Sequence, residues 1–306
     1  MFETPWVTNR SALFDRFSKE EIVERYRKNY GLSNDIGWEQ VEQHTNLESQ
    51  LTDELLSSTP ESRVAIFEHA YFRLYNELPW LTGTGTHSGG QQWAALMRPG
   101  ASVYEVGSGA GYLINYLAKM GYKCVGTDLA SERQKVASSN ESSVTWDVTD
   151  GVHLTRFANR DCFDYVISDQ VVEHLHPDDI ITHFNEARQL LRPGGQYIVR
   201  TPYAPCGPGD LSVVFGEAKP IFMHLHEFDY DEMRYIKSAC GYSEVKAVFK
   251  FPKTSICLVS KYYRKYLSLN DRFMKSNSRL IRKINRAKKW RKFLFLPSGV
   301  WVTFER

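Results

Sequence analysis

The sequence predicts an α/β fold in which helices cover a doubly wound, seven-stranded and mostly parallel sheet. Short apolar runs alternate with helical periodicity from residue 100 onward, a glycine-rich turn follows the first run, and a hairpin closes the alternation. We expect three regions in chain order: a helical N-terminal cap over 1–90, a core over 91–260 and a basic C-terminal extension over 261–306.

The cap is predicted from two stretches in which apolar residues recur at three- and four-residue steps, between Leu13 and Tyr26 and between Val64 and Leu78. Pro79 ends the second stretch. The glycine-rich run over 83–90 should form a loop, since glycine disfavours helix and strand interiors. No lysine follows it, so its likeness to a phosphate-binding loop is superficial, and His87 within it is expected either to be exposed or to close over a ligand.

The core is predicted element by element from its apolar runs and helical stripes. The clearest helix begins at Pro177 and is expected to end at Pro193-Gly194-Gly195. We expect strands at 103–106, 123–127, 144–146, 163–168, 196–200, 243–249 and 255–260, and further helices at 112–120 and 231–239.

Composition and charge restrict the function classes. A chain of 306 residues that is 42% hydrophobic and 24% charged can bury a sizeable core, which excludes disorder as its main state. Five scattered cysteines favour a reduced, cytoplasmic setting. The first 15 residues are too polar for a secretory signal, and no apolar run approaches the roughly 18 residues that cross a bilayer.

A nucleoside pocket is predicted where the first strand meets the following helix. The run from Glu105 to Gly111 places three glycines at this turn, where the backbone can approach a ligand and free N–H groups attract negative charge. Asp128 ends the second strand and suits a ribose, and Asp147 follows the third and suits an adenine amino group. Each acid could instead cap a helix, above all Asp147.

The glycine spacing distinguishes two cofactors. A dinucleotide fingerprint needs a third glycine where Tyr112 stands, and the glycines run G-x-G-x-G instead. Here the chain resembles the class I S-adenosylmethionine (SAM) dependent methyltransferases over about residues 100–260. The resemblance is carried by the glycine loop, Asp128, Asp147, the segment 164–169, Leu191-Arg192-Pro193-Gly194-Gly195 and the terminal hairpin, which the family carries as an antiparallel last strand.

The resemblance implies SAM as cofactor. Glu105 and the glycine loop would hold its methionine part, Asp128 its ribose, Asp147 its adenine, and Asp169 would lie near the sulfonium. The implied cofactor-binding set is Glu105, Gly107, Ser108, Gly109, Gly111, Asp128, Leu129, Asp147, Val148, Asp169 and Gln170.

Two His-Leu-His triplets supply candidates for activating an acceptor. An alcohol needs a general base or a metal ion, whereas nitrogen and phenolic acceptors react with little help. We expect His174 as the base, His226 as the second choice and Glu173 beside them. Alternatively Glu173 and His174 only shape the cofactor pocket.

A divalent metal is the less favoured alternative. Residues 170–174 and His226 resemble the E-x-x-E-H element and later histidine of small-RNA 2′-O-methyltransferases, which implies Glu173, His174 and His226 as ligands if a metal binds. Gln170, however, replaces a carboxylate, and the loss of a negative charge weakens a site for a hard cation.

The C-terminal extension is strongly basic. Residues 261–306 hold 14 basic and 2 acidic side chains, against 24 and 34 in the rest of the chain. The apolar spacing over 280–294 predicts a basic amphipathic helix with Trp290 at its edge. Over 261–294 it could contact an anionic membrane, track phosphates or pack on the acidic body. Val300 to Phe304 should fold back.

The sequence therefore predicts a cytoplasmic SAM-dependent methyltransferase, with peripheral contact to the inner membrane surface as an option. The expected acceptor is a sugar hydroxyl of an envelope glycan or of its lipid-linked precursor. A small metabolite, methylated on oxygen or nitrogen, and an RNA 2′-hydroxyl are alternatives, and a non-catalytic SAM-binding scaffold is the least favoured. The acidic body disfavours nucleic acid, and the sequence predicts no oligomeric state.

Overall fold

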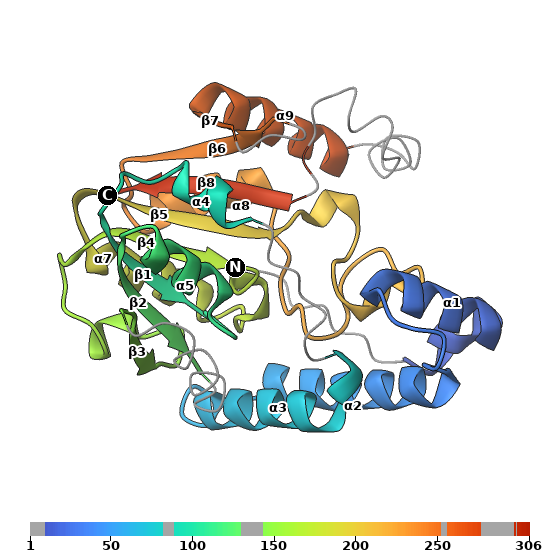
Figure 1. Ribbon diagram of the computed structural model, residues 1–306. Coiled ribbons are helices and arrows are strands. Elements are labelled where there is room, and N and C mark those ends of the chain that lie inside the picture. The colour runs from blue at the N-terminus through green and yellow to red at the C-terminus, as the bar shows by residue number, and fades with distance from the viewer. Residues whose placement is uncertain (1–9, 82–88, 130–142, 252–255, 277–296, 298) are drawn as a thin grey trace. The chain divides into compact units, whose positions relative to one another are not determined.

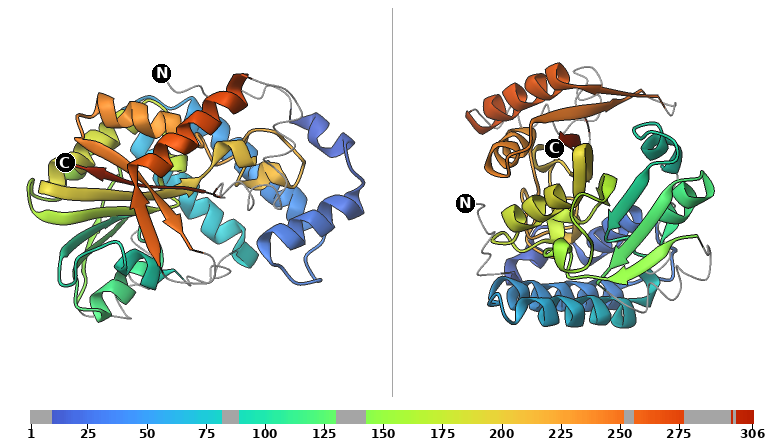
Figure 2. Two further views of the ribbon diagram at one scale, coloured as in Figure 1. Left: turned by 90° about the horizontal axis from the view of Figure 1, so that it is seen from above. Right: turned by 90° about the vertical axis from the view of Figure 1, so that its left-hand side faces the viewer.

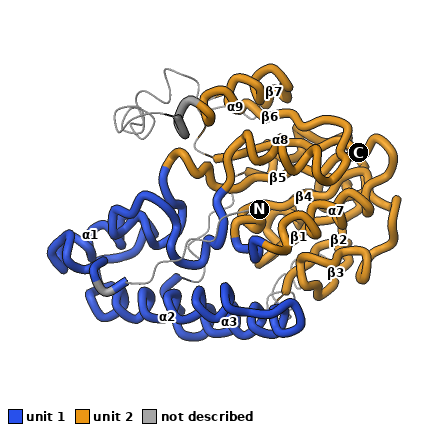
Figure 3. The backbone as a smooth tube through the Cα atoms, turned by 180° about the vertical axis from the view of Figure 1, so that it is seen from behind, with its two compact units in different colours: residues 1–86, 174–177, 207–227 blue, residues 87–173, 178–206, 228–306 orange. Residues whose placement is uncertain are grey.

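The computed structural model describes residues 10–81, 89–129, 143–251, 256–276, 297 and 299–306 (Figure 1). The chain forms two compact units, coloured separately in Figure 3. The helical unit comprises residues 1–86, 174–177 and 207–227, and the sheet unit comprises 87–173, 178–206 and 228–306. The three predicted regions follow chain order, whereas these units interleave along the chain.

The helical unit contains α1 (Lys19–Tyr30), α2 (Trp38–Leu56) and α3 (Arg63–Glu77), with short 3₁₀ turns at Ser11–Asp15 and Pro79–Leu81. The stretch predicted from Leu13 to Tyr26 is divided because Ser18 begins α1. The Ser18 hydroxyl accepts a hydrogen bond from the Glu21 N–H, and the Glu21 carboxylate accepts one from the Ser18 N–H. Gly31, with φ +66°, ends the helix.

A late segment of the chain completes the helical core. Residues 207–227 contribute Phe215 and Phe222, which are fully buried in one cluster with Ile22 of α1 and Val41 of α2. The Arg25 guanidinium also donates hydrogen bonds to two backbone carbonyls of this segment, at 2.5 and 2.7 Å. The apolar faces of the first helices are therefore buried by residues nearly two hundred positions later.

The sheet unit confirms the predicted α/β class with eight strands instead of seven. Their order is β3-β2-β1-β4-β5-β8-β6-β7, and β1 to β5 are parallel. The strands are β1 (Ser102–Val106), β2 (Lys123–Asp128), β3 (Thr145–Val148), β4 (Phe163–Asp169), β5 (Leu191–Pro202), β6 (Glu244–Lys250), β7 (Cys257–Ser260) and β8 (Gly299–Glu305). The helices are α4 (Gly90–Ala94), α5 (Tyr112–Lys119), α7 (Ile180–Leu190), α8 (Tyr230–Ala239) and α9 (Lys261–Ser276), with 3₁₀ turns η3 (Leu154–Arg156) and η4 (Val172–His174).

The eighth strand corrects the predicted end of the sheet. The hairpin from the predicted ranges 243–249 and 255–260 forms as β6 and β7, but neither strand pairs with β5. Instead β8, the last strand of the chain, lies antiparallel between β5 and β6. The predicted fold-back of residues 300–304 thus places them inside the sheet, where all five are buried.

Helices cover both faces of the sheet (Figures 1 and 2), and apolar side chains pack between them and the strands. On one face, Trp93 of α4 and Leu117 of α5 share a cluster with Ile198 and Trp301 of the strands. Tyr197 and Phe304 pack with Phe184 of α7, at ring-centroid distances of 5.4 and 5.3 Å. Because neighbouring strand residues point to opposite sides, Tyr197 and Ile198 belong to opposite layers.

The helix expected to end at Pro193-Gly194-Gly195 ends at Leu190, and these three residues belong to β5. The C-terminal residue explains the difference, because Arg306 donates its N–H to the Gly195 carbonyl and accepts from the Gly194 N–H. Hydrogen bonds to a residue more than a hundred positions later thus make Gly194 and Gly195 part of a strand, although Pro-Gly-Gly alone predicts the end of a helix.

The basic extension is described over α9 and β8. The amphipathic helix predicted over 280–294 lies outside the described residues, as does His87. Within the described part of the chain, no helix combines the length and the apolar character that crossing a bilayer requires.

We predict that Phe304→Ala lowers the free energy of unfolding by about 3–5 kcal/mol, the usual cost of deleting a buried phenyl ring. Phe304 is fully buried against Phe184, Tyr197 and Tyr242. Urea denaturation followed by circular dichroism measures the change. The exposed Met120→Ala is the matched control and should shift stability by less than about 0.5 kcal/mol. A loss under about 1 kcal/mol for Phe304→Ala would mean that β8 is not part of the cooperative core.

Candidate functional site

The glycine loop lies at the carboxyl ends of β1 and β2 in the sheet unit. Gly107, Gly109 and Gly111 have φ values of +67°, +53° and +75°, a region that residues with a side chain rarely adopt. The Ser108 N–H donates to the Thr127 carbonyl at 2.7 Å, and the Gly109 N–H donates to Asp128 Oδ2, also at 2.7 Å. The turn is therefore tied to the end of the neighbouring strand.

Gly107 also permits a close approach from the segment after β4. A Cβ atom at this position would lie 2.5 Å from Val171 Cγ2, closer than real Cβ contacts allow. The loop is thus a cradle in which backbone groups stay accessible and a side chain would not fit.

Glu105 is the least satisfied of the predicted cofactor residues. Its side chain is 3% exposed, and Oε2 has no hydrogen-bond partner among the described residues. Burial raises the pKa of the Glu105 carboxyl to about 8, and the nearby charges of Asp169 and Asp128 add to the effect against a lowering hydrogen bond from Ser108. A buried carboxyl with an unmet oxygen fits a cationic ligand group, such as the ammonium of SAM.

The other predicted cofactor residues lie at the same edge of the sheet. Asp128 ends β2 opposite Val148, and Leu129 follows it directly. Asp147 lies within β3, whereas the sequence predicts it directly after that strand, and it lines a hollow of about 310 Å³ with residues 155–159. Their contacts with ribose and adenine stay predictions.

Asp169 is held by a cation that the sequence did not identify. Both of its carboxylate oxygens accept hydrogen bonds from Arg200, at 2.6 and 2.5 Å. The Arg200 guanidinium also lies over the rings of Trp93 and Trp301, at 5.5 and 5.4 Å from their centroids. The strand register aligns Asp169 with Arg200, and the rings of Trp93 in α4 and Trp301 in the late strand β8 hold the guanidinium in place.

Gln170 and Glu173 shape the segment after β4. Gln170 adopts φ +58°, and its N–H donates to the Arg200 carbonyl at 2.8 Å. Glu173 is fully buried, and its Oε2 accepts a hydrogen bond from the Thr201 hydroxyl at 2.8 Å. The Glu173 carboxylate thus supports the end of β5.

His174 begins the short segment of the helical unit that follows Glu173. Its Nδ1 lies 2.9 Å from the Met223 carbonyl oxygen, which only accepts, so Nδ1 carries the hydrogen and Nε2 keeps its lone pair. Burial, followed by the neighbouring His224, lowers the pKa of His174 to about 3. His174 is therefore neutral at physiological pH and accepts hydrogen bonds through Nε2.

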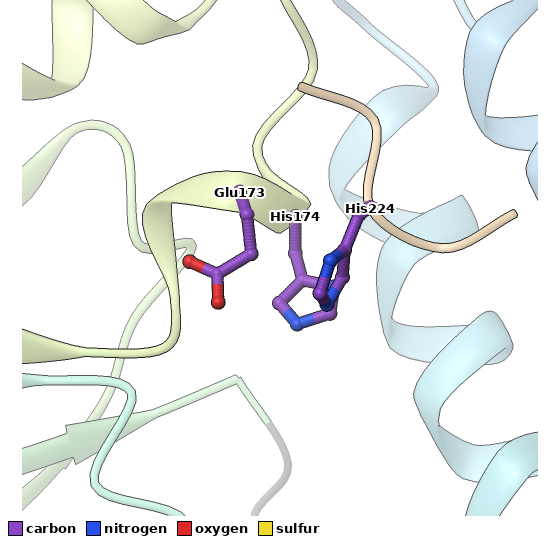
Figure 4. A group of neighbouring side chains, drawn as sticks. All are labelled: Glu173, His174 and His224. Atoms are coloured by element: carbon purple, nitrogen blue, oxygen red, sulfur yellow. The ribbon is translucent and has the colours of Figure 1, made fainter. Parts of the chain in front are cut away.

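The second histidine of this cluster is His224, whereas the sequence pointed to His226. The rings of His174 and His224 lie edge to face with centroids 4.8 Å apart, and Figure 4 shows them side by side. His224 Nδ1 lies 2.7 Å from Glu227 Oε1. The sequence does not distinguish the two histidines, because each is followed three residues later by a carboxylate, Glu227 or Asp229.

Buried carboxylates fix the loop that carries His224. Asp210 accepts hydrogen bonds from the N–H groups of Ser212 and Phe222, at 3.0 and 3.2 Å. Glu227 Oε1 also accepts from the Gly209 N–H at 2.6 Å, while its buried Oε2 has no partner among the described residues. His224 therefore lies on a loop that buried carboxylates hold in place.

These two histidines supply nitrogen donors that a metal ion could share. The sequence analysis named His174 and His226 among the possible metal ligands, and the described geometry of the helical unit brings His174 together with His224. Two imidazoles supply two of the three or four protein ligands that a zinc ion usually takes.

Comparisons with known proteins find similarity to methyltransferases. Residues 104–199 match the family model described as a methyltransferase domain. The ubiquinone biosynthesis O-methyltransferase of Cereibacter sphaeroides is 32% identical over 110 residues, which cover 35% of this chain and 44% of that protein. The cyclopropane-fatty-acyl-phospholipid synthase of Escherichia coli is 31% identical over 106 residues, 34% of this chain and 27% of that protein. The chain spans less than half the length of these relatives.

A solved structure shares the fold. The 1,6-didemethyltoxoflavin-N1-methyltransferase of Burkholderia thailandensis, solved with S-adenosylhomocysteine (SAH), gives a TM-score of 0.50 at 15% identity and covers 81% of this chain and 91% of that one.

We predict that SAH binding releases about one proton at neutral pH. Glu105 is mostly protonated there because its pKa is about 8, and a ligand ammonium favours the carboxylate. Calorimetry in buffers of different ionisation enthalpy measures the release. Glu105→Gln cannot release this proton, so its binding heat should not depend on the buffer. A wild-type heat that is equally independent of the buffer would exclude this role.

We also predict that Asp128→Ala weakens SAH binding at least about tenfold, because it removes charge-assisted hydrogen bonds to a ribose and the anchor of Gly109. Turnover at saturating SAM should change much less, since these contacts form in the ground state. Asp128→Asn is the matched variant and should recover part of the affinity. Unchanged affinity in both variants would remove Asp128 from the cofactor site.

Proposed function

We propose that the whole protein is a class I SAM-dependent methyltransferase that transfers a methyl group from SAM to an alcohol oxygen, a proposal supported by the match of residues 104–199 to the methyltransferase domain model. The acceptor that we propose is a sugar hydroxyl of an envelope glycan or of its lipid-linked precursor. The observation that carries the proposal is the His224–Glu227 pair, because an alcohol is the acceptor class that requires a positioned base.

The cofactor site is proposed in the sheet unit. Bound SAM supplies an electrophilic methyl group on a sulfonium. Glu105 would hold the ammonium, the backbone N–H groups of the glycine loop would face the ligand, and Asp128 would accept from the ribose. Asp169 is already paired with Arg200, so we assign it the positioning of that guanidinium.

The base is proposed to be His224. When neutral, an imidazole whose Nδ1–H is held by Glu227 presents its Nε2 lone pair, and the carboxylate stabilises the imidazolium that forms on proton transfer. His174, our choice from the sequence, is a weaker base because its pKa is about 3. We therefore assign His174 the role of accepting a hydrogen bond through Nε2 and so orienting the acceptor hydroxyl.

Chain connectivity limits the distance between His174 and Asp169, which lies at the edge of the sheet where we propose the cofactor site. His174 follows Asp169, the last residue of β4, by five positions, so at most about 18 Å of chain separates their Cα atoms. This limit on the distance supports a role for the His174 cluster in methyl transfer.

Two observations support the proposed sugar acceptor: a base positioned for an alcohol, and the positive charge of the C-terminal extension. Residues 261–306 carry a net charge of +12, whereas residues 1–260 carry −10. Such an extension suits a substrate borne by an anionic surface. A second candidate is a phenolic small molecule, which the names of the curated ubiquinone relatives favour and which needs less help from a base.

We predict that His224→Ala lowers turnover of an alcohol acceptor by about a hundredfold or more, because general base catalysis typically contributes that factor. The assay follows transfer of a labelled methyl group from SAM to sugar nucleotides, lipid-linked oligosaccharides and phenols. Glu227→Gln should lower turnover and change its pH profile, since it acts through His224. SAH affinity should stay unchanged in both variants.

His226→Ala is the matched control and should keep near wild-type turnover. Two results would contradict the proposal: a hundredfold loss in His226→Ala with none in His224→Ala, or transfer to phenols but to no alcohol. Failure to bind SAH at all would instead remove the methyltransferase assignment itself.

A further inference from the structure

The end of the sheet unit carries an exposed apolar surface formed by the β6–β7 hairpin and α9. Helix α9 begins directly where β7 ends, and it packs along β6 (Figure 1). Apolar side chains this exposed are unusual when they gather in one place. We call it the β7–α9 surface, and its members, between 42% and 71% exposed, are Phe251, Ile256, Leu258, Tyr262, Tyr266 and Leu269.

Ring contacts make this surface continuous. Phe251 packs on Phe249 at 5.0 Å, Phe249 on Tyr263 at 5.2 Å, and Tyr263 on Tyr266 at 6.4 Å between ring centroids. The chain of rings runs from the hairpin onto the helix. In the described part of the chain, β7 pairs with β6 alone and so forms the edge of the sheet.

Helix α9 has three distinct faces. Successive residues turn by about 100°, so the exposed Lys261, Lys265 and Arg272 fall within about 40° of one another. The exposed Tyr262, Tyr266 and Leu269 form a second stripe directly beside them. The third, buried face consists of Arg264, Leu267, Ser268 and Asp271.

Contacts with α8 fix which face is exposed. The Asp271 carboxylate accepts hydrogen bonds from the Tyr230 and Asp231 N–H groups at 2.8 and 3.2 Å, and also from the Tyr203 hydroxyl. The Ser268 hydroxyl donates to the Tyr230 carbonyl at 3.1 Å. The helix cannot roll its apolar stripe inward without breaking these bonds.

The basic stripe remains accessible although two of its members also pair with acids. Lys261 Nζ lies 3.9 Å from Glu244, and Arg272 lies 3.0 Å from Asp231, yet their side chains are 48% and 54% exposed. Residues 273–292 continue the pattern in the sequence with nine basic side chains and no acidic one.

We propose that the β7–α9 surface docks on the surface of an anionic membrane. Tyrosine and aliphatic side chains beside lysines are the combination that inserts into the headgroup layer while its charges meet anionic lipids. A second copy of the chain would bring two basic stripes together across a twofold axis. Nucleic acid would use the lysines but gives no reason for exposed Leu258 and Leu269.

The acidic remainder of the chain would orient this contact, because its net charge of −10 is repelled by the same membrane. The docking goes beyond the methyl transfer proposed above and does not depend on it. It would bring the enzyme to the surface on which a lipid-linked acceptor is held.

The test is flotation of the full-length chain with vesicles of phosphatidylglycerol and phosphatidylcholine, and with vesicles of phosphatidylcholine alone. The wild type should float with the anionic vesicles. The triple variant Tyr262→Ser, Tyr266→Ser, Leu269→Ser should bind them at least about tenfold more weakly, because it removes the apolar stripe. Lys261→Gln with Lys265→Gln should cost about fivefold per lysine, the factor that corresponds to about 1 kcal/mol each.

Matched controls separate this surface from exposed side chains elsewhere in the sheet unit. Tyr235→Ser with Met120→Ser, and Lys119→Gln with Lys123→Gln, change exposed residues of the same kinds and should leave binding unchanged. All variants should keep the wild-type circular dichroism spectrum and SAH affinity, so a loss of vesicle binding cannot reflect misfolding or a failed cofactor site.

Several results would overturn the proposal. Wild-type binding by the triple variant would show that residues outside the β7–α9 surface make the contact. Equal binding to vesicles without anionic lipid would exclude charge recognition. A dimer in light scattering that the triple variant dissolves, or an RNA affinity that the triple variant loses while vesicle binding persists, would assign the surface to another partner.

Discussion

The antiparallel insertion of β8 between β5 and β6 is the constraint on which the rest of the sheet unit depends. These last residues of the chain pair with strands formed about fifty and a hundred positions earlier, so the sheet is incomplete until the end of the chain is in place. The same strand carries Trp301 against the Arg200 guanidinium, which holds Asp169 by two hydrogen bonds. The chain end thus completes the fold and shapes the edge where the cofactor site is proposed.

Three carboxylates gather at that edge, and the structure treats each differently. Arg200 compensates the charge of Asp169, and the Gly109 N–H contacts Asp128. Glu105 keeps a buried oxygen without a partner in the described residues, and burial raises its pKa to about 8. A buried carboxylate is costly unless a cation or a proton accompanies it. The Glu105 carboxyl is therefore stable in its neutral, protonated form, whereas a cationic ligand would stabilise its ionised form. The preference for a cationic ligand is thus linked to the protonation of Glu105.

The sequence predicts what local pattern determines and misses what distant partners determine. The strand and loop positions around Glu105 and Asp128 follow from apolar runs and glycines close together in the chain, and the structure has them there. The pairing of Asp169 with Arg200, the strand conformation of Gly194 and the placement of β8 depend on segments up to a hundred residues apart. Periodicity carries no signal for such pairings, because register and side-chain reach appear only once the sheet is assembled.

Asp271 shows that the net charge of a segment can hide a specific structural contact made by one of its residues. It is the single acidic residue between Lys261 and Lys292, and the charge pattern alone suggests a uniformly basic stretch. Its buried carboxylate instead accepts the first N–H groups of α8, where a negative charge is favoured by the free N–H groups and the helix dipole. This one contact divides the stretch into an anchored helix and a continuation. Because β7 and β8 both run antiparallel to β6, they are parallel to each other, and the chain between them crosses from one end of the sheet to the other. Helix α9 makes the first part of this crossing, and its contacts with α8 fix the side on which its basic and aromatic stripes lie.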